Sequence, residues 1–112
     1  LKDLKHSTRQ RFIAIEFDYP GRREETAIIS AEADCHAEIA ADLAKLGEKV
    51  RHLKAHGLAE GVSTRLLVYA GKLIADGISP RRACQTAIAQ ALTDDLEIKG
   101  TIEEVIDSIF EE

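Results

Sequence analysis

The sequence predicts a mainly α-helical fold, in which a small helical bundle is preceded by one strand-like arm. Hydrophobic residues make up 45% of the chain but aromatic residues only 4%, and Trp and Met are absent. A core built from Leu, Ile, Val and Ala favours packed helices over a β-sandwich. From residue 22 onward, apolar residues recur at spacings of three and four, which is the period of amphipathic helices. The 112 residues have room for one modest core.

The strand-like arm is predicted at residues 12–17, where Phe and Ile alternate at short spacing. Pro20 and Gly21 follow as a turn signal and separate the arm from the helical part. One strand cannot pair its own backbone N–H and C=O groups. Either its sheet partners lie outside this chain, or it is a short extended arm.

Five helices are predicted after the arm. The first covers residues 22–33, with Glu24 and Glu25 in its first turn, where carboxylates favour the helix dipole. The second covers residues 37–55 and ends before Gly57.

The other three helices are predicted from their start and stop signals. Ser63 is an N-cap for a helix that ends at Gly77, Ser79 with Pro80 starts the next helix, and Thr101 opens the last one. The residues expected to be largely buried are Leu43, Leu46, Val50, Leu66, Leu67, Leu73, Ile88, Val105, Ile106 and Ile109.

Composition excludes several classes of function. The net charge of −5 argues against a nucleic-acid-binding domain. No apolar run approaches the roughly 18 residues of a membrane helix, and no secretory signal is visible, so a cytoplasmic protein without membrane insertion is expected. Cys35 and Cys84 are far apart, and neither they nor the four histidines have metal-site spacing, so no metal site is predicted. The absence of an initial Met suggests a fragment of a longer protein.

The chain lacks the elements of a nucleotide-hydrolysing P-loop. Gly71-Lys72 is its only Gly-Lys pair, but Leu73 follows and Leu66 stands where the first Gly of the motif belongs. The pair also falls inside a predicted amphipathic helix, which makes it a chance match. We therefore expect no ATP turnover from this chain alone.

Two arginines break the local pattern. Arg11 directly precedes the predicted strand, where a guanidinium can point at an anion. Arg65 stands two residues after the Ser63 cap, where its charge opposes the helix dipole. Each has two interpretations from the residues alone, a solvated surface charge or an anion-binding group.

Three blocks of sequence resemble the C-terminal end of AAA+ ATPases of the MoxR branch, most closely the CbbQ/NirQ/NorQ family. They are STRQRFIAIEFDYP at residues 7–20, HGLAEGVSTRLLVYAG at residues 56–71, and PRRAC at residues 80–84 followed by ALTDD at residues 91–95. The blocks come in family order and span nearly the whole chain. The resemblance implies that residues 1–20 end the AAA+ core, with the strand belonging to the core sheet, and that residues 21–112 form the helical lid.

The resemblance also implies roles for individual residues. Arg11 takes the place of the arginine finger that acts on a neighbouring subunit, with Arg9 as the alternative. Arg65 takes the place of the sensor 2 residue, which reaches the γ-phosphate of ATP, and Thr64 stands beside it at the nucleotide. ATP and Mg²⁺ would be held mainly by a core N-terminal to this chain.

The family further implies a homo-hexameric ring, an adaptor with a von Willebrand factor A domain, and Rubisco or nitric oxide reductase as the target that ATP hydrolysis remodels or activates. The alternative is a free-standing helical interaction domain without ATPase activity.

Overall fold

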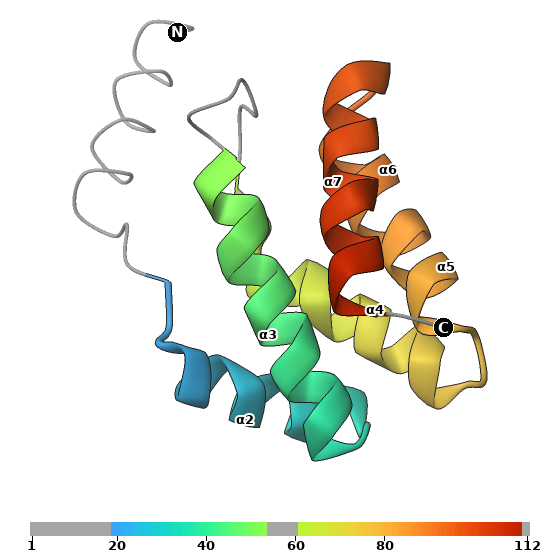
Figure 1. Cartoon of the computed structure of the whole chain (residues 1–112). Coiled ribbons are helices and arrows are strands. Elements are labelled where there is room, and N and C mark those ends of the chain that lie inside the picture. The colour runs from blue at the N-terminus through green and yellow to red at the C-terminus, as the bar shows by residue number, and fades with distance from the viewer. Residues whose placement is uncertain (1–18, 54–60, 111–112) are drawn as a thin grey trace, which may run out of the picture.

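The computed structural model describes residues 19–53 and 61–110, and this part of the chain is helical (Figure 1). Its elements, in order, are α2 (Arg22–Ala33), α3 (Ala37–His52), α4 (Thr64–Ala75), α5 (Pro80–Cys84), the π-helical segment η2 (Gln85–Ala89), α6 (Gln90–Leu92) and α7 (Leu96–Ile109). The mainly helical fold is confirmed, and no strand occurs within the described ranges. The strand expected at residues 12–17 lies outside them.

The helices pack in two groups around α4. Helix α2 crosses α3, and both contact α4 (Figure 1). Helix α7 lies against α3, α5 and η2. The fully buried core includes six of the ten residues expected there, namely Leu43, Leu46, Val50, Leu67, Ile88 and Ile106. The other four, Leu66, Leu73, Val105 and Ile109, are only partly buried.

Most helix boundaries follow the predicted signals, but α3, which was expected to reach residue 55, ends at His52. The Ser63 hydroxyl accepts a hydrogen bond from the backbone N–H of Leu66, so the predicted start of α4 is confirmed. The last helix was expected to open at Thr101, and this is wrong: α7 begins at Leu96, because the Asp95 carboxylate accepts from the N–H groups of the first turn. Thr101 lies inside α7, and its hydroxyl donates to the carbonyl of Glu97.

The helix after Ser79 contains a feature that the sequence did not predict. Pro80 stands in its first turn, as expected, and the chain then runs without a break from α5 through the π-helical η2 into α6. In a π-turn the backbone hydrogen bonds join residues five apart instead of four, and such a turn can occur inside a continuous α-helix. The helix is therefore continuous to Leu92, where it ends at the extended residue Thr93.

Gly71 allows α4 to approach α2 closely. A Cβ at this position would lie 2.8 Å from the Cβ of Ala33 and 3.3 Å from the Sγ of Cys35. Gly71 and Lys72 lie within α4, with Lys72 in its last turn, so the pair is not part of a loop that could surround a phosphate. The interpretation of this pair as a chance match to a P-loop is confirmed.

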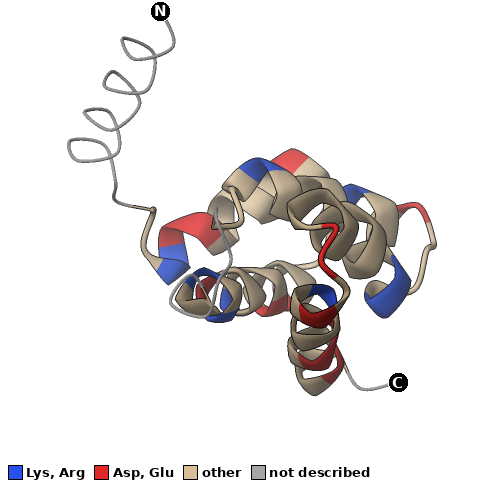
Figure 2. Ribbon diagram, turned by 90° about the horizontal axis from the view of Figure 1, so that it is seen from above, with Lys and Arg blue, Asp and Glu red and all other residues tan. Residues whose placement is uncertain are grey.

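Charged residues of both signs lie close together where α2 crosses α3, whereas acidic residues dominate the last helix before the C-terminus (Figure 2). Within the described part of the chain, no helix has the length and apolarity needed to cross a bilayer.

Candidate functional site

The N-terminus of α4 carries the two described residues that were predicted to contact nucleotide, Thr64 and Arg65. Ser63 is extended and caps the helix, so the chain turns sharply into the first turn. The first N–H groups of a helix have no partner within that helix, and together with the dipole they favour anions. Arg65 is exposed, and its guanidinium has no hydrogen-bond or ion-pair partner among the described residues.

The first turn of α4 has no carboxylate that would neutralise this positive end. Helices α2, α3 and α7 each carry at least one acidic residue in their first turn, whereas α4 and the short α5 carry none. Arg65 adds a full positive charge to the same turn. The arrangement is electrostatically suited to a phosphate, because the dipole and the guanidinium attract it together.

A buried carboxylate lies directly behind this helix end. Glu25 of α2 is fully buried, and its two oxygens accept from the Nη1 and Nη2 groups of Arg51 in α3 at 2.8 and 2.6 Å. The Thr64 hydroxyl donates to the same carboxylate, 2.6 Å from Oε2. This fork satisfies the Glu25 charge within the bundle.

Arg51 makes two further contacts with its remaining surfaces. Its Nε donates to the carbonyl of Val62 at 2.9 Å, and its guanidinium lies 3.8 Å from the centre of the Tyr19 ring. We call the set Tyr19, Glu25, Arg51, Val62 and Thr64 the Arg51 cluster. It joins the segment that enters α2, the end of α3 and the start of α4.

This cluster was not predicted from the sequence, although one signal for it was present. Glu25 was interpreted as a helix-dipole residue, yet it is spaced by four and eight from Ile29 and Ala33, which are buried on the same face of α2. A carboxylate on a buried stripe requires a partner. Nothing in the sequence indicates that Arg51 is the cation that meets Glu25.

Thr64 and Arg65 are thus neighbours with different surroundings. The Thr64 side chain points into the bundle and binds Glu25, whereas the Arg65 side chain is exposed. The Thr64 oxygen keeps the ability to accept one further hydrogen bond, so its predicted contact with nucleotide stays a prediction. Arg11 and Arg9 lie outside the described residues, and their predicted role as finger stays a prediction as well.

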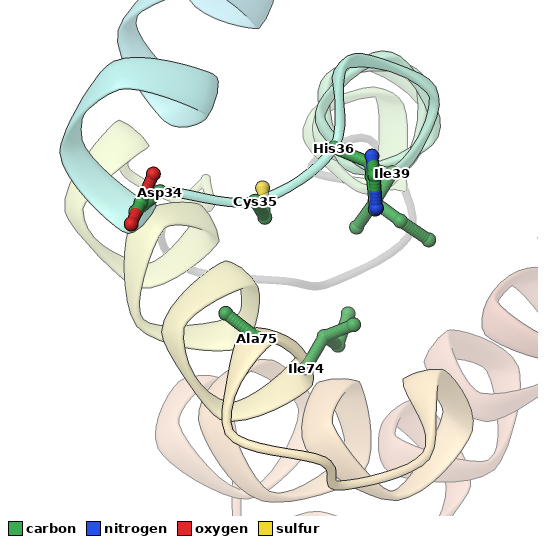
Figure 3. Close-up of a pocket in the computed structure, with 6 residues that line it drawn as sticks. All are labelled: Asp34, Cys35, His36, Ile39, Ile74 and Ala75. Atoms are coloured by element: carbon green, nitrogen blue, oxygen red, sulfur yellow. The ribbon is translucent and has the colours of Figure 1, made fainter.

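The opposite end of α4 borders a hollow of about 390 Å³ (Figure 3). The connection between α2 and α3 lines it with Asp34, Cys35 and His36, and α4 contributes Ile74 and Ala75. Partial burial raises the pKa of the Cys35 thiol, so it is a weak nucleophile at neutral pH. This hollow is separated from Arg65 by the length of α4.

A second, apolar groove runs along the exposed side of α4. It is lined by Leu66, Tyr69 and Leu73 of α4, with Ala87 and Ala91 from the following helix. This explains why Leu66 and Leu73, which were expected in the core, are only partly buried.

The remaining candidate ligands are separate from one another. Cys84 is buried in the core, and burial raises the pKa of its thiol to about 12. The described ranges contain no group of three or more His, Cys, Asp or Glu side chains that could hold a metal ion. Two other arginines are paired: Arg22 forms an ion pair with Glu48, and Arg81 donates to the carbonyl of Phe110 and lies 3.5 Å from Asp107.

The fold and this helix end together define a small helical domain with an exposed arginine in the first turn of an internal helix. Comparison with known proteins identifies the family. Residues 25–109 match the model of the CbbQ/NirQ/NorQ C-terminal domain. The chain therefore belongs to the CbbQ/NirQ/NorQ family and corresponds to its C-terminal part, and proteins of this family are AAA+ ATPases.

Relatives with three different names are similar at nearly equal levels. Protein CbbQ of Hydrogenophilus thermoluteolus is 46% identical over 98% of this chain, the denitrification regulatory protein NirQ of Pseudomonas aeruginosa 45% over 96%, and protein NorQ of Paracoccus denitrificans 44% over 98%. Each alignment covers 41% of the relative, so the chain spans about two fifths of their length.

Proposed function

We propose that this chain is the lid and arginine-finger portion of a hexameric AAA+ ATPase that uses ATP hydrolysis to remodel or activate a target enzyme in the cytoplasm. Family membership supports the ATPase class. The observation that carries the proposal is Arg65, which is exposed and unpaired among the described residues in the first turn of α4. An unpaired cation at the positive end of a helix is explained if an anion binds there.

The residues of α4 fit the γ-phosphate of ATP. Arg65 would bind it through charge-assisted hydrogen bonds, and the free N–H groups of the first turn would add donors. Bound ATP with Mg²⁺ supplies the phosphoryl group to be transferred, and both are held mainly by a core outside this chain. Arg65 acts by positioning and by stabilising charge on the transferred group.

Arg11 is proposed to act on the nucleotide of a neighbouring subunit, with Arg9 as the alternative. Its place before the predicted strand in the block STRQRF, which resembles the finger segment of the family, supports this role. A finger in trans acts chiefly on the transition state and contributes roughly 10³–10⁵ in rate. Rings that mix Arg11→Ala subunits with subunits lacking the P-loop Lys should recover part of the activity, and mixed rings as inactive as either parent would argue against action in trans.

The proposal is tested in a chimera in which residues 1–112 replace the matching C-terminal part of the Hydrogenophilus thermoluteolus CbbQ. Arg65→Ala should remove about 2–4 kcal/mol of transition-state stabilisation and so lower the ATPase rate. Arg82→Ala is the matched control, because Arg82 is also exposed in the first turn of a helix that follows a Ser residue. An unchanged rate for Arg65→Ala in an active ring would return Arg65 to a solvated surface charge.

The alternative is a free-standing helical interaction domain without ATPase activity. The exposed apolar groove beside Tyr69 is the observation that favours it. The coding sequence upstream of residue 1 separates the two: the motif G-x-x-x-x-G-K-[ST] there supports the ATPase, and its absence supports the interaction domain. The pure 112-residue chain should show no saturable ATP hydrolysis.

The target and partners are proposed by analogy with the relatives. The names CbbQ, NirQ and NorQ occur at nearly equal identity, so Rubisco and nitric oxide reductase remain alternative targets. A homo-hexamer and an adaptor with a von Willebrand factor A domain complete the proposal. Co-purification of the full-length protein with each candidate target, in the presence of ATP, distinguishes the two.

A further inference from the structure

We propose that Arg51 and Glu25 are positioning residues that set the direction of Arg65, because they fix the start of α4 to the segment that enters the helical domain at Tyr19. This inference rests on the proposed function of Arg65. Neither residue would touch nucleotide. They would act through the Arg51 cluster, which holds the backbone on both sides of the Ser63 cap.

Arg51 of α3 connects several segments of the chain. Its Nη groups bind Glu25 of α2, its Nε binds the carbonyl of Val62, and its face stacks on Tyr19. A guanidinium is planar and presents its donors in a fixed fork. When these contacts are made together, the relative orientation of α2, the end of α3 and the approach to α4 is fixed.

The Arg51 cluster also contacts the residues that immediately precede Arg65. Thr64, the residue before Arg65, donates its hydroxyl to Glu25, and Val62 lies just before the cap. Gly61 lies against Tyr19, since a Cβ there would be 2.6 Å from the Tyr19 hydroxyl oxygen. The chain that leads into Arg65 is therefore held by contacts with Tyr19, Arg51 and Glu25, while the Arg65 side chain is exposed.

The stability of the bundle alone does not require a buried ion pair between Arg51 and Glu25. The side chains of Arg51 and Glu25 are 10% and 0% exposed, and a buried ion pair can often be replaced by apolar residues without loss of stability. Helices α2 and α3 are already joined by the exposed pair Arg22–Glu48, which does not contact α4. What the buried pair adds is the connection to Thr64, Val62 and Tyr19.

The consequence is mechanical coupling. A change in the direction of the chain at Tyr19 would reach Arg51 through the stacked ring. Arg51 passes it to Glu25 and Val62, and these hold the first turn of α4. The orientation of Arg65 would thus follow the orientation of the preceding part of the protein.

The test is a double-mutant cycle on the ATPase rate of the full-length chimera. Arg51→Lys keeps the charge but cannot form the fork and the stack together. It should lower kcat about 10–100-fold, as expected when an arginine near the reacting group is misplaced by about 1 Å. In the Arg65→Ala background the same change should cost less than about 2-fold, because residues that act through one another are not additive.

Two further variants keep the test decisive if Arg51→Lys does not fold. Tyr19 is partly exposed, so Tyr19→Leu removes the aromatic face at the surface, and Tyr19→Phe restores it. Tyr19→Leu should lower kcat and Tyr19→Phe should not, and again only when Arg65 is present. Arg22→Gln, which breaks the exposed pair between the same helices, should leave kcat unchanged in both backgrounds.

Equal losses with and without Arg65 would overturn the positioning role and leave a structural one, as would full activity of both Arg51→Lys and Tyr19→Leu. If Arg65→Ala by itself has no effect, the proposed function of Arg65 fails, and the coupling fails with it. That outcome is read from the single variant and is therefore distinct.

Discussion

Two ion pairs connect α2 with α3, and they differ in how far they are buried. Arg22 binds Glu48 and Arg51 binds Glu25, in both cases through two nitrogens of one guanidinium, and each pair is separated by 26 positions in sequence. The side chains of the first pair are 52% and 38% exposed, whereas those of the second are 10% and 0% exposed.

The difference lies in what surrounds each pair. Arg22 and Glu48 are solvated and join only two helices, so either side chain can return to water if the other is lost. Glu25 is enclosed by the bundle and also accepts from Thr64, so its charge depends on Arg51. The same chemical pairing is therefore a solvated surface contact in one place, whereas in the other the removal of Arg51 alone leaves a buried, uncompensated carboxylate.

The largest expected effect is the loss of Arg51. Arg51→Ala leaves the Glu25 carboxylate buried without its cation, which should lower the free energy of unfolding by about 3–5 kcal/mol. Arg22→Ala should have a much smaller effect, because Glu48 remains solvated. Urea unfolding of the 112-residue chain measures both variants, and similar small effects would contradict the contrast between the pairs.

Close packing gives a second contrast, between Gly71 and Gly100. A Cβ at Gly71 would press against the Ala33 Cβ at 2.8 Å, whereas none of the atoms described lies within 4 Å of a Cβ at Gly100. Gly71→Ala should therefore cost about 1–3 kcal/mol. Gly100→Ala should stabilise α7 by about 0.5–1 kcal/mol, since Ala favours a helix. The two unfolding midpoints should move in opposite directions, and a stabilised Gly71→Ala variant would disprove the close approach of α4 to α2.

Burial also separates the two cysteines. The pKa of the Cys84 thiol is raised by burial from 9.0 to about 12, so the folded chain keeps its proton where the unfolded chain loses it. The resulting stability is fully present below pH 9 and is lost as the pH rises toward 12, by up to about 1.4 kcal/mol per pH unit.

Cys84→Ala removes this dependence. Between about pH 8 and 10.5 the stability advantage of the wild type over the variant should shrink by about 2 kcal/mol. Parallel pH profiles of the two proteins would show that the Cys84 thiol is not held in its protonated form. A thiol-alkylating reagent should react with Cys35, which is partly exposed, before it reaches Cys84.

The smallest expected effect belongs to the exposed pair. The hydrogen bond from Arg22 lowers the pKa of Glu48, so this pair contributes stability above the ordinary glutamate value and loses it as the pH falls. Because both groups are largely solvated, the effect is discounted by screening. Glu48→Gln should therefore alter the acid-unfolding profile only slightly, and less so in high salt; a salt-independent loss would contradict a solvated pair.

The sequence predicted the features that depend on neighbouring residues. Helix α2 at residues 22–33, the Ser63 cap and the Pro80 start follow from local signals, and the structure confirms them. The start of α7 was placed too late, at Thr101, because Asp95, which caps the helix, was not identified as a cap. The π-turn was not predicted, since no local residue signal requires it.

The site was only half predictable for the same physical reason. Arg65 could be singled out because its conflict with the helix dipole is local. Glu25 and Arg51 meet across 26 positions, and neither periodicity nor capping indicates which charges will be enclosed together. Long-range pairing depends on how α2 crosses α3, which only the tertiary structure shows (Figure 1).

The role of Arg65 is tested most directly by comparing how tightly the ring of the full-length chimera binds an ATP analogue and ADP. If Arg65 binds the γ-phosphate, Arg65→Ala should weaken binding of a non-hydrolysable ATP analogue by about 10–150-fold, the value of a charge-assisted hydrogen bond, and leave ADP binding unchanged. Arg82→Ala should leave both dissociation constants unchanged. An Arg65→Ala ring that binds the ATP analogue and ADP with the same ratio as the parent would contradict the assignment of Arg65 and, with it, the role proposed for this helix end.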